Sequence, residues 1–278
     1  MVKQILVCLE GSSSSVCATE VAIAMARDLG ATLVGLAVVD EPDILSNEAT
    51  GFGGSSYKHD RDQALLADAH EHARAWLEAF ADRCSNAGVV AQTSELTGRP
   101  AATILDELAR YDLTVLGRDV NFRFETEERD ARTRDLILRR AGKPVVVVPE
   151  AVVESRPNVL IAYDGSPAAR RALRSFADSG LGRDRALHVA AMDDDGAIAW
   201  EMATRGCQAL AELGLIAAPH NLVSTRSIAD AMLDLRAKLD AGLIVLGAYT
   251  RGKMSRLLWG SVTEQMLGKT VVPLFVHY

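Results

Sequence analysis

The chain carries the same succession of segments twice, and this internal repeat limits its possible folds more than any other feature. The apolar run that ends in Glu10-Gly11-Ser12 returns, with the same spacing, in front of Asp164-Gly165-Ser166. Two later segments recur in the same order: Leu113–Gly117 returns as Leu243–Gly247, and Lys143–Val148 is echoed by Lys269–Val276. Three echoes in one order indicate a tandem duplication.

Within each copy, short apolar runs alternate with longer segments whose apolar residues recur at helical spacing. The runs predict strands at Ile5–Leu9, Thr32–Val39, Val89–Leu96, Leu113–Leu116 and Val145–Val148, and again at Val159–Tyr163, Ala186–Met192, Asn221–Ser224, Leu243–Leu246 and Val271–Val276. Strands that alternate with helices pair in parallel, and runs without polar alternation are buried on both faces. We therefore predict an α/β fold with two doubly wound domains, residues 1–150 and 157–278, each an open five-stranded parallel sheet with helices on both faces.

Each copy ends on an apolar strand that would otherwise form an exposed sheet edge, and such edges are normally covered or paired. We expect Val145–Val148 and Val271–Val276 to lie together, so that the two domains pack as a pseudo-twofold dimer. The first copy is longer, and its extra residues fit the stretch 41–62. This stretch is either a lid over a ligand or a surface loop, and we favour the surface loop because loop entropy grows slowly with length.

Composition excludes several classes of protein. Nearly half of the 278 residues are hydrophobic and the net charge is −7, which argues against general binding to nucleic acid or acidic membranes. No apolar run approaches the roughly 20 residues needed to cross a bilayer, and we expect no secretory signal. The four cysteines are scattered and form no Cys-x-x-Cys pair, so a reducing cytoplasm is the expected location.

The chemistry-bearing residues gather after the predicted strands of the second copy. In an open α/β sheet, ligands bind at the carboxyl ends of the strands, beside the point where the strand order reverses. These ends carry Asp164, Met192-Asp193 and Gly247, and Gly260-Ser261-Val262-Thr263 then opens a helix. A helix start offers unpaired N–H groups and partial positive charge, which favours a polyphosphate. The alternative is that Gly260-Ser261 only caps the helix.

Other site types find little support in the sequence. There is no Walker A motif, no dinucleotide fingerprint and no Gly-x-Ser-x-Gly elbow. We expect His70 and His72 to be solvated, His188 to be packed, and Trp76 and Phe80 to belong to the core. The remaining histidines, His59, His220 and His277, have no recognisable carboxylate or cysteine partner at ligand spacing. Asp193-Asp194-Asp195 is either a Mg²⁺ site or, as we favour, a solvated acidic turn.

Two patterns resemble the universal stress protein family: the acid-Gly-Ser after the first strand, and Gly247-x-x-Thr250 followed after nine residues by Gly260-Ser261. The resemblance covers the whole chain as two tandem copies. Nucleotide-binding members show a second glycine where this chain has Thr250. The resemblance implies ATP, possibly with Mg²⁺, in the second domain. The residues implied to bind it are Ala162, Asp164, Gly165, Ala191, Gly247, Thr250, Arg251, Gly260, Ser261, Val262 and Thr263. The first copy departs further, with Asp130 and Ala131 where the Gly-Ser pair is expected and Glu10 for the aspartate, so we expect it to have lost nucleotide.

The resemblance thus predicts a cytoplasmic ATP-binding regulatory module of the stress response, with no catalytic residues. Its expected partners are an adenine nucleotide, an unidentified protein and a second copy in a homodimer, but no nucleic acid and no membrane. Two alternatives stay open: an interaction scaffold that binds no nucleotide, and a slow ATPase. The second is the weaker, because no positioned general base is visible in the sequence.

Overall fold

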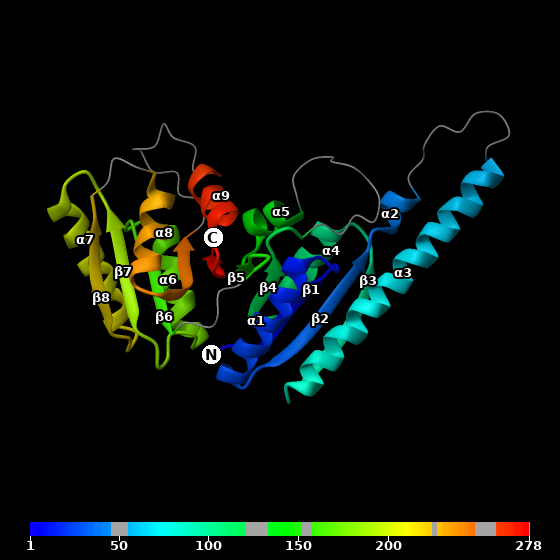
Figure 1. Ribbon diagram of the computed structural model, residues 1–278, viewed down its shortest axis with the longest axis horizontal. Helices are drawn as coiled ribbons and strands as arrows, with labels where there is room; N and C mark the ends of the chain where they lie inside the picture. The colour runs from blue at the N-terminus through cyan, green and yellow to red at the C-terminus, as the bar shows by residue number, and fades with distance from the viewer. Residues whose placement is uncertain (46–54, 121–132, 152–156, 224–226, 248–259, 278) are drawn as a thin grey trace.

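The computed structural model describes residues 1–45, 55–120, 133–151, 157–223, 227–247 and 260–277 (Figure 1). The first half contains β1 (Gln4–Leu9), α1 (Ser13–Leu29), β2 (Thr32–Val39), α2 (Glu41–Ile44), α3 (Ser55–Asn86), β3 (Ala91–Thr97), α4 (Pro100–Leu108), β4 (Leu113–Gly117), α5 (Thr133–Arg140) and β5 (Val145–Val148). The second half contains β6 (Asn158–Ala162), α6 (Pro167–Ser179), β7 (Leu187–Met192), α7 (Gly196–Ala211), β8 (Ala217–Leu222), α8 (Ile228–Lys238), β9 (Ala241–Gly247), α9 (Gly260–Lys269) and β10 (Leu274–His277).

All the strands form one ten-stranded sheet in the order β3-β2-β1-β4-β5-β10-β9-β6-β7-β8. Each half contributes five parallel strands, and the halves join where β5 and β10 pair antiparallel, with Val146 opposite Phe275. The predicted α/β fold with two doubly wound halves is confirmed, and so is the pairing of the two last strands. A complete pseudo-twofold packing of the halves stays a prediction.

Helices cover both faces of the sheet, as alternating strands and helices require. One face carries α1, α3, α6 and α7, and Phe80 and Phe176 lie buried in its core. The other carries α4, α5, α8 and α9 over a second core that contains Leu36, Ile137 and Leu274. Both cores continue from one half into the other, so the junction between the halves is packed like the interior of each half. Among the described residues, no helix is both long enough and apolar enough to cross a membrane.

The two halves share the local structure that follows their first strand. Gly11 and Gly165 adopt φ of +80° and +71°, a left-handed conformation that favours glycine. The next residue, Ser12 or Ser166, caps the helix by accepting a hydrogen bond from the backbone N–H of Ser15 or Ala169, at 3.1 Å in both cases. The acid-Gly-Ser phrase is therefore, first of all, a turn that starts a helix in each half.

The structure differs from the sequence prediction at several places. The stretch 41–62 is not only a loop, because residues 41–44 form α2 and residues 55–62 belong to α3; residues 46–54 lie outside the described residues. The last strand begins at Leu274 rather than Val271, after Pro273, which has no N–H to donate to a strand neighbour. In the acidic turn, Asp195 caps α7 by accepting from the Ala197 N–H at 2.8 Å, which agrees with the favoured interpretation of a turn.

Candidate functional site

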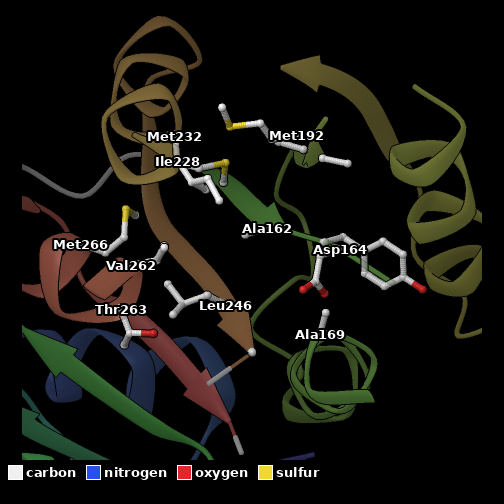
Figure 2. A pocket seen from close by; sticks show the side chains of 14 residues that line it. Ala162, Asp164, Ala169, Met192, Ile228, Met232, Leu246, Val262, Thr263 and Met266 are labelled. Carbon is white, nitrogen blue, oxygen red and sulfur yellow. The ribbon is translucent and has the colours of Figure 1, made fainter. Parts of the chain in front are cut away.

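A cavity of about 120 Å³ opens at the carboxyl edge of the sheet in the second half. It lies where β6 has β7 on one side and β9 on the other, the point at which the strand order reverses. Figure 2 shows its lining side chains, with α8 and α9 on one side and the turn after β6 on the other. The lining residues are Ala162, Tyr163, Asp164, Ala169, Ala190, Ala191, Met192, Ile228, Met232, Leu246, Gly247, Val262, Thr263 and Met266.

Small side chains leave this space open. Ala162 ends β6 and pairs in register with Ala190 of β7, and both line the cavity. Met232 of α8 and Met266 of α9 close it from the helical layer, and both are almost fully buried. The walls are thus alanine and flexible methionine, which suits a flat apolar group.

Polar groups enter the cavity at two points. Thr263, in the first turns of α9, is only 3% exposed, and its Oγ1 has no hydrogen-bond partner within the described residues. A buried hydroxyl without a partner is destabilising, so this oxygen is suited to a bound polar group. Asp164 follows β6 with an exposed carboxylate that accepts from the Ser166 N–H at 2.9 Å. The cavity therefore combines an apolar chamber, a carboxylate and a hydroxyl beside a helix start.

The structure brings six of the predicted site residues together around this cavity. These are Ala162, Asp164, Ala191, Gly247, Val262 and Thr263. Gly165 lies in the turn after β6, beside the cavity but not in its wall. Gly260 and Ser261 are the first two residues of α9. Thr250 and Arg251 lie outside the described residues.

Gly247 lines the cavity and also has a packing role. A Cβ at this position would lie 2.4 Å from the backbone carbon of Ala168, at the start of α6. Gly117 of the first half is pressed in the same way against Ser14 and Ser15 of α1. The glycine that ends the fourth strand of each half therefore allows a helix to pack against the strand, with or without a ligand nearby.

Sequence reasoning missed most of the apolar walls of the cavity, apart from Ala162, Ala191 and Val262. Met232 lies in one of the segments whose apolar residues recur at helical spacing, and Met192 ends a predicted strand. Periodicity shows that a side chain points inward, but not whether it meets another side chain or an open space. The other missed lining residues are Tyr163, Ala169, Ala190, Ile228, Leu246 and Met266.

In the first half, larger side chains occupy the corresponding place. Cys8 corresponds to Ala162, and strand register places Leu36 opposite Cys8 as Ala190 lies opposite Ala162. Leu36 is 1% exposed and belongs to the same core cluster as Ile104 and Val120. Val120 stands three residues after Gly117, the position that Thr250 holds after Gly247. All four residues are buried, and Cys8 and Leu36 are larger than Ala162 and Ala190, which line the cavity at the same positions of the second half.

A buried arginine replaces the hydroxyl of the cavity. Pro144 and Pro273 are equivalent, because their carbonyls accept from the N–H groups of the equivalent residues Thr114 and Ile244. Arg134 and Thr263 stand the same number of residues before these prolines, so Arg134 is the counterpart of Thr263. Arg134 is 3% exposed; its Nη1 donates to the Arg118 carbonyl at 2.8 Å, and its Nε and Nη2 meet Asp135 at the same distance. This guanidinium is therefore held by partners within its own half.

The turn after the first strand is also covered in the first half. A Cβ on Gly11 would lie 2.4 Å from Nε1 of Trp76, whereas a Cβ on Gly165 would meet nothing within 4 Å. Trp76 belongs to α3 and packs against the core, as the sequence predicted for this stripe. The two acid-Gly-Ser turns thus have the same backbone but different surroundings.

The histidines correct part of the sequence analysis. His70 is half-buried and pairs with Glu95, so the prediction that it is solvated was wrong, whereas His72 is exposed as predicted, with its Nδ1 3.3 Å from Asp68 and its ring stacked on Trp76. Nε2 of His220 lies 2.9 Å from Nδ1 of His188, a contact that the sequence analysis did not anticipate. Among the described residues, no group of three or more His, Cys, Asp or Glu side chains could hold a metal ion.

Comparison with known proteins agrees with the repeat and the fold. The model of the universal stress protein family matches the chain twice, over residues 1–149 and 156–277. The chain is 25% identical over 285 residues to the universal stress protein Slr1230 of Synechocystis sp., and the alignment covers 98% of each protein.

Two solved structures share the fold over nearly the whole chain. A universal stress protein from Archaeoglobus fulgidus has a TM-score of 0.69 and 21% identity, covering 99% of this chain and 97% of that one. A putative universal stress protein from Pseudomonas aeruginosa has a TM-score of 0.53 and 19% identity, covering 99% and 93%. Because the two family matches together span almost all 278 residues, the chain belongs to the universal stress protein family.

Proposed function

We propose that the second half binds an adenine nucleotide, ATP, in this cavity, and that the protein is a nucleotide-responsive regulator of the stress response without dedicated catalysis. The observation that carries the proposal is the contrast between the halves. The cavity of the second half is open and contains a buried hydroxyl without a described partner, whereas the first half has the larger side chains of Cys8 and Leu36 at the positions of Ala162 and Ala190. A cytoplasmic location is part of the same proposal, and all four cysteines are free thiols.

The lining residues suit the parts of a nucleotide. Ala162, Ala190 and Ala191 leave space for a planar base between the strands and Met232, where flexible thioethers adapt to an aromatic face. The Asp164 carboxylate is placed to accept hydrogen bonds from ribose hydroxyls. The Thr263 hydroxyl and the N–H groups that open α9 are suited to phosphate oxygens, since a helix start favours anions.

Any Mg²⁺ in this proposal would arrive with the phosphates. The described residues contain no cluster of carboxylates that would hold the ion alone. Asp193 and Asp195, the strongest candidates in the sequence, use a carboxylate oxygen each to accept backbone N–H groups in their own turn. The contribution of the protein is therefore to bind and orient the nucleotide.

The test is to give the second half the side chain that fills the first. Ala190→Leu places the residue type of Leu36 at the corresponding position, and ATP binding to the full chain is measured by calorimetry. We expect affinity to fall at least about 30-fold, or about 2 kcal/mol, because the added volume occupies the space proposed for the base. Ala67→Leu, on an exposed part of α3, is the matched control and should bind as the wild type does.

Two outcomes would contradict the proposal. If the wild-type chain shows no ATP binding at millimolar concentration, the alternative of an interaction scaffold without nucleotide is favoured. If Ala190→Leu folds normally and still binds ATP with unchanged affinity, the nucleotide lies elsewhere. Circular dichroism of each variant distinguishes loss of the site from loss of the fold.

A further inference from the structure

A pair of histidines lies close to the cavity, near the outer edge of the sheet. His188 is in β7 and His220 is in β8, the last strand on this side. His188 is in register with Ala218 and His220 with Ala190, so both imidazoles project from the same face of the sheet. Their facing atoms, Nδ1 of His188 and Nε2 of His220, are 2.9 Å apart, and the ring centroids are 5.0 Å apart.

The fold itself does not require this pair. In the first half, register assigns Val34 to the position of His188 and Ser94 to that of His220. The same strands form there with an aliphatic side chain and a hydroxyl. The histidine pair therefore belongs to the half that has the open cavity, and backbone geometry does not explain it.

The two rings are arranged as ligands of one cation could be. Neutral imidazole offers one nitrogen lone pair and is the commonest metal ligand among side chains. Zn²⁺ binds such nitrogens at about 2.0–2.1 Å in a tetrahedral arrangement, which separates two of them by roughly 3.3 Å. The observed 2.9 Å is reached from this spacing by a small side-chain rotation. Both side chains are only half-buried, so solvent can supply the other ligands.

The surroundings keep these nitrogens available. Burial lowers the pKa of His188, and burial together with the neighbouring His188 lowers the pKa of His220. Neither imidazole forms an ion pair with a carboxylate in the described part of the chain, where His70 and His72 both do. In the absence of a metal ion, a single proton between the two nitrogens accounts for their short contact.

We propose that Nδ1 of His188 and Nε2 of His220 form a two-histidine site for Zn²⁺ at the β7–β8 edge, with water completing the coordination. Because His220 is paired with Ala190, a bound ion would join the edge strand to the strand that lines the cavity. The proposal does not depend on nucleotide binding, and each can fail without the other.

The test uses the full-length chain without an affinity tag and without nucleotide. Zn²⁺ binding is measured by competition with a chromophoric chelator, and Co²⁺ replaces Zn²⁺ to give a visible absorption spectrum. We expect one ion per chain, and at least tenfold weaker binding in His188→Asn and in His220→Asn, which remove one ligand each. His72→Asn, an exposed histidine on α3, is the matched control and should not change the affinity.

Three results would overturn the proposal. The first is a wild-type chain with no one-to-one Zn²⁺ site whose dissociation constant is below about 100 µM, which corresponds to about 5.5 kcal/mol of binding free energy. The second is equal Zn²⁺ affinity in the wild type and both pair variants. The third is a loss of affinity in His72→Asn that is as large as the loss in the pair variants. Each would show that the pair is a hydrogen bond only. Far-ultraviolet circular dichroism of the variants distinguishes these results from misfolding.

Discussion

The two halves of this protein have the same strand order and the same helix-capping turn, yet different side chains stand at the carboxyl edge of the sheet, where the second half has an open cavity. The difference lies in side-chain volume. Ala162 and Ala190 leave space where Cys8 and Leu36 fill it. The same backbone framework thus carries different side-chain volumes at the same place in the two halves.

The shared features are equally instructive. The positive-φ glycine, the capping serine and the glycine that ends the fourth strand occur in both halves. These residues are needed for the packing of a helix against its strand. The features that differ are Trp76 over Gly11, Arg134 in place of Thr263, and Leu36 in place of Ala190. These positions, rather than the glycines, separate a filled half from an open one.

The largest effect should follow from emptying the filled half. Leu36→Ala removes a buried side chain from the core, so we expect the free energy of unfolding to fall by about 3 kcal/mol. Chemical denaturation measures it. Leu45→Ala, at a side chain that is 42% exposed, should cost less than about 1 kcal/mol.

The same variant also tests what closes the first half. Arg134 and Trp76 are still in place in Leu36→Ala, so the variant should gain no second ATP site. A stoichiometry of two nucleotides per chain would show that Leu36 alone separates the halves.

Adding a methyl group to either strand-ending glycine should reduce stability in both halves alike. Gly117→Ala and Gly247→Ala each place a Cβ within 3 Å of helix backbone that cannot move aside without shifting the helix. We expect a loss of about 2 kcal/mol in each variant, measured by thermal or chemical unfolding. Gly142→Ala, where a Cβ would meet nothing within 4 Å, is the control. A cost at Gly247 alone would mean that this glycine serves the cavity and not the packing.

Much of the fold was predictable because burial on both faces produces unbroken apolar runs. Thr32–Val39 and Val145–Val148 were predicted with the bounds that the structure has. The repeat also indicated how the halves meet, since an apolar last strand needs a neighbour. The prediction was poorer where local signals are weak: β8 contains Pro219 and polar residues, and it ends two residues earlier than expected.

From the residues alone the candidate site was predictable at its polar positions, while Ala162, Ala191 and Val262 were implied only by the family resemblance. Asp164 and Thr263 stand in a recognisable pattern at a strand end and a helix start. The alanines and methionines of the cavity wall have the same periodicity as core residues, so no local signal distinguishes them. The His188–His220 contact joins residues 32 positions apart in different strands, and it depends on a register that only the structure supplies.

A smaller effect is expected at Thr263, where removal of the hydroxyl should increase stability but weaken ATP binding. Thr263→Val keeps the shape of the side chain but removes a buried oxygen without a described partner, so the ligand-free protein should gain about 1 kcal/mol. ATP binding should weaken about tenfold, or 1.4 kcal/mol, if this hydroxyl holds a phosphate. Calorimetry and denaturation of the same sample measure both. A loss of stability would instead show that the hydroxyl has a structural partner.

The smallest effect is expected at the junction of the halves, where the residue that ends the last strand differs between the two halves. His277 of β10 is the counterpart of the fully buried Val148, since each lies opposite the strand-ending glycine of its half. Its Nδ1 lies 2.6 Å from the Ser175 hydroxyl. Burial is the main cause that lowers the pKa of His277, and the positive charges of Arg171 and Lys143 lower it further. Hydrogen bonds with the backbone of Gly142 and Arg171 raise this pKa but do not cancel the shift.

The sign of the pH effect follows from this lowered pKa. Above the ordinary histidine pKa of about 6.5, the ring is neutral in both states and stability is complete. As the pH falls below that value, the unfolded chain takes up the proton before the folded one, so stability is lost until the folded pKa is passed. His277→Gln should make the decline of unfolding free energy between about pH 7 and pH 5 shallower, whereas His59→Gln, on exposed α3, should not. If the slope of unfolding free energy against pH is unchanged in His277→Gln, the junction tolerates a protonated imidazole at this position. The protonation state of His277 then contributes nothing to holding the two halves together.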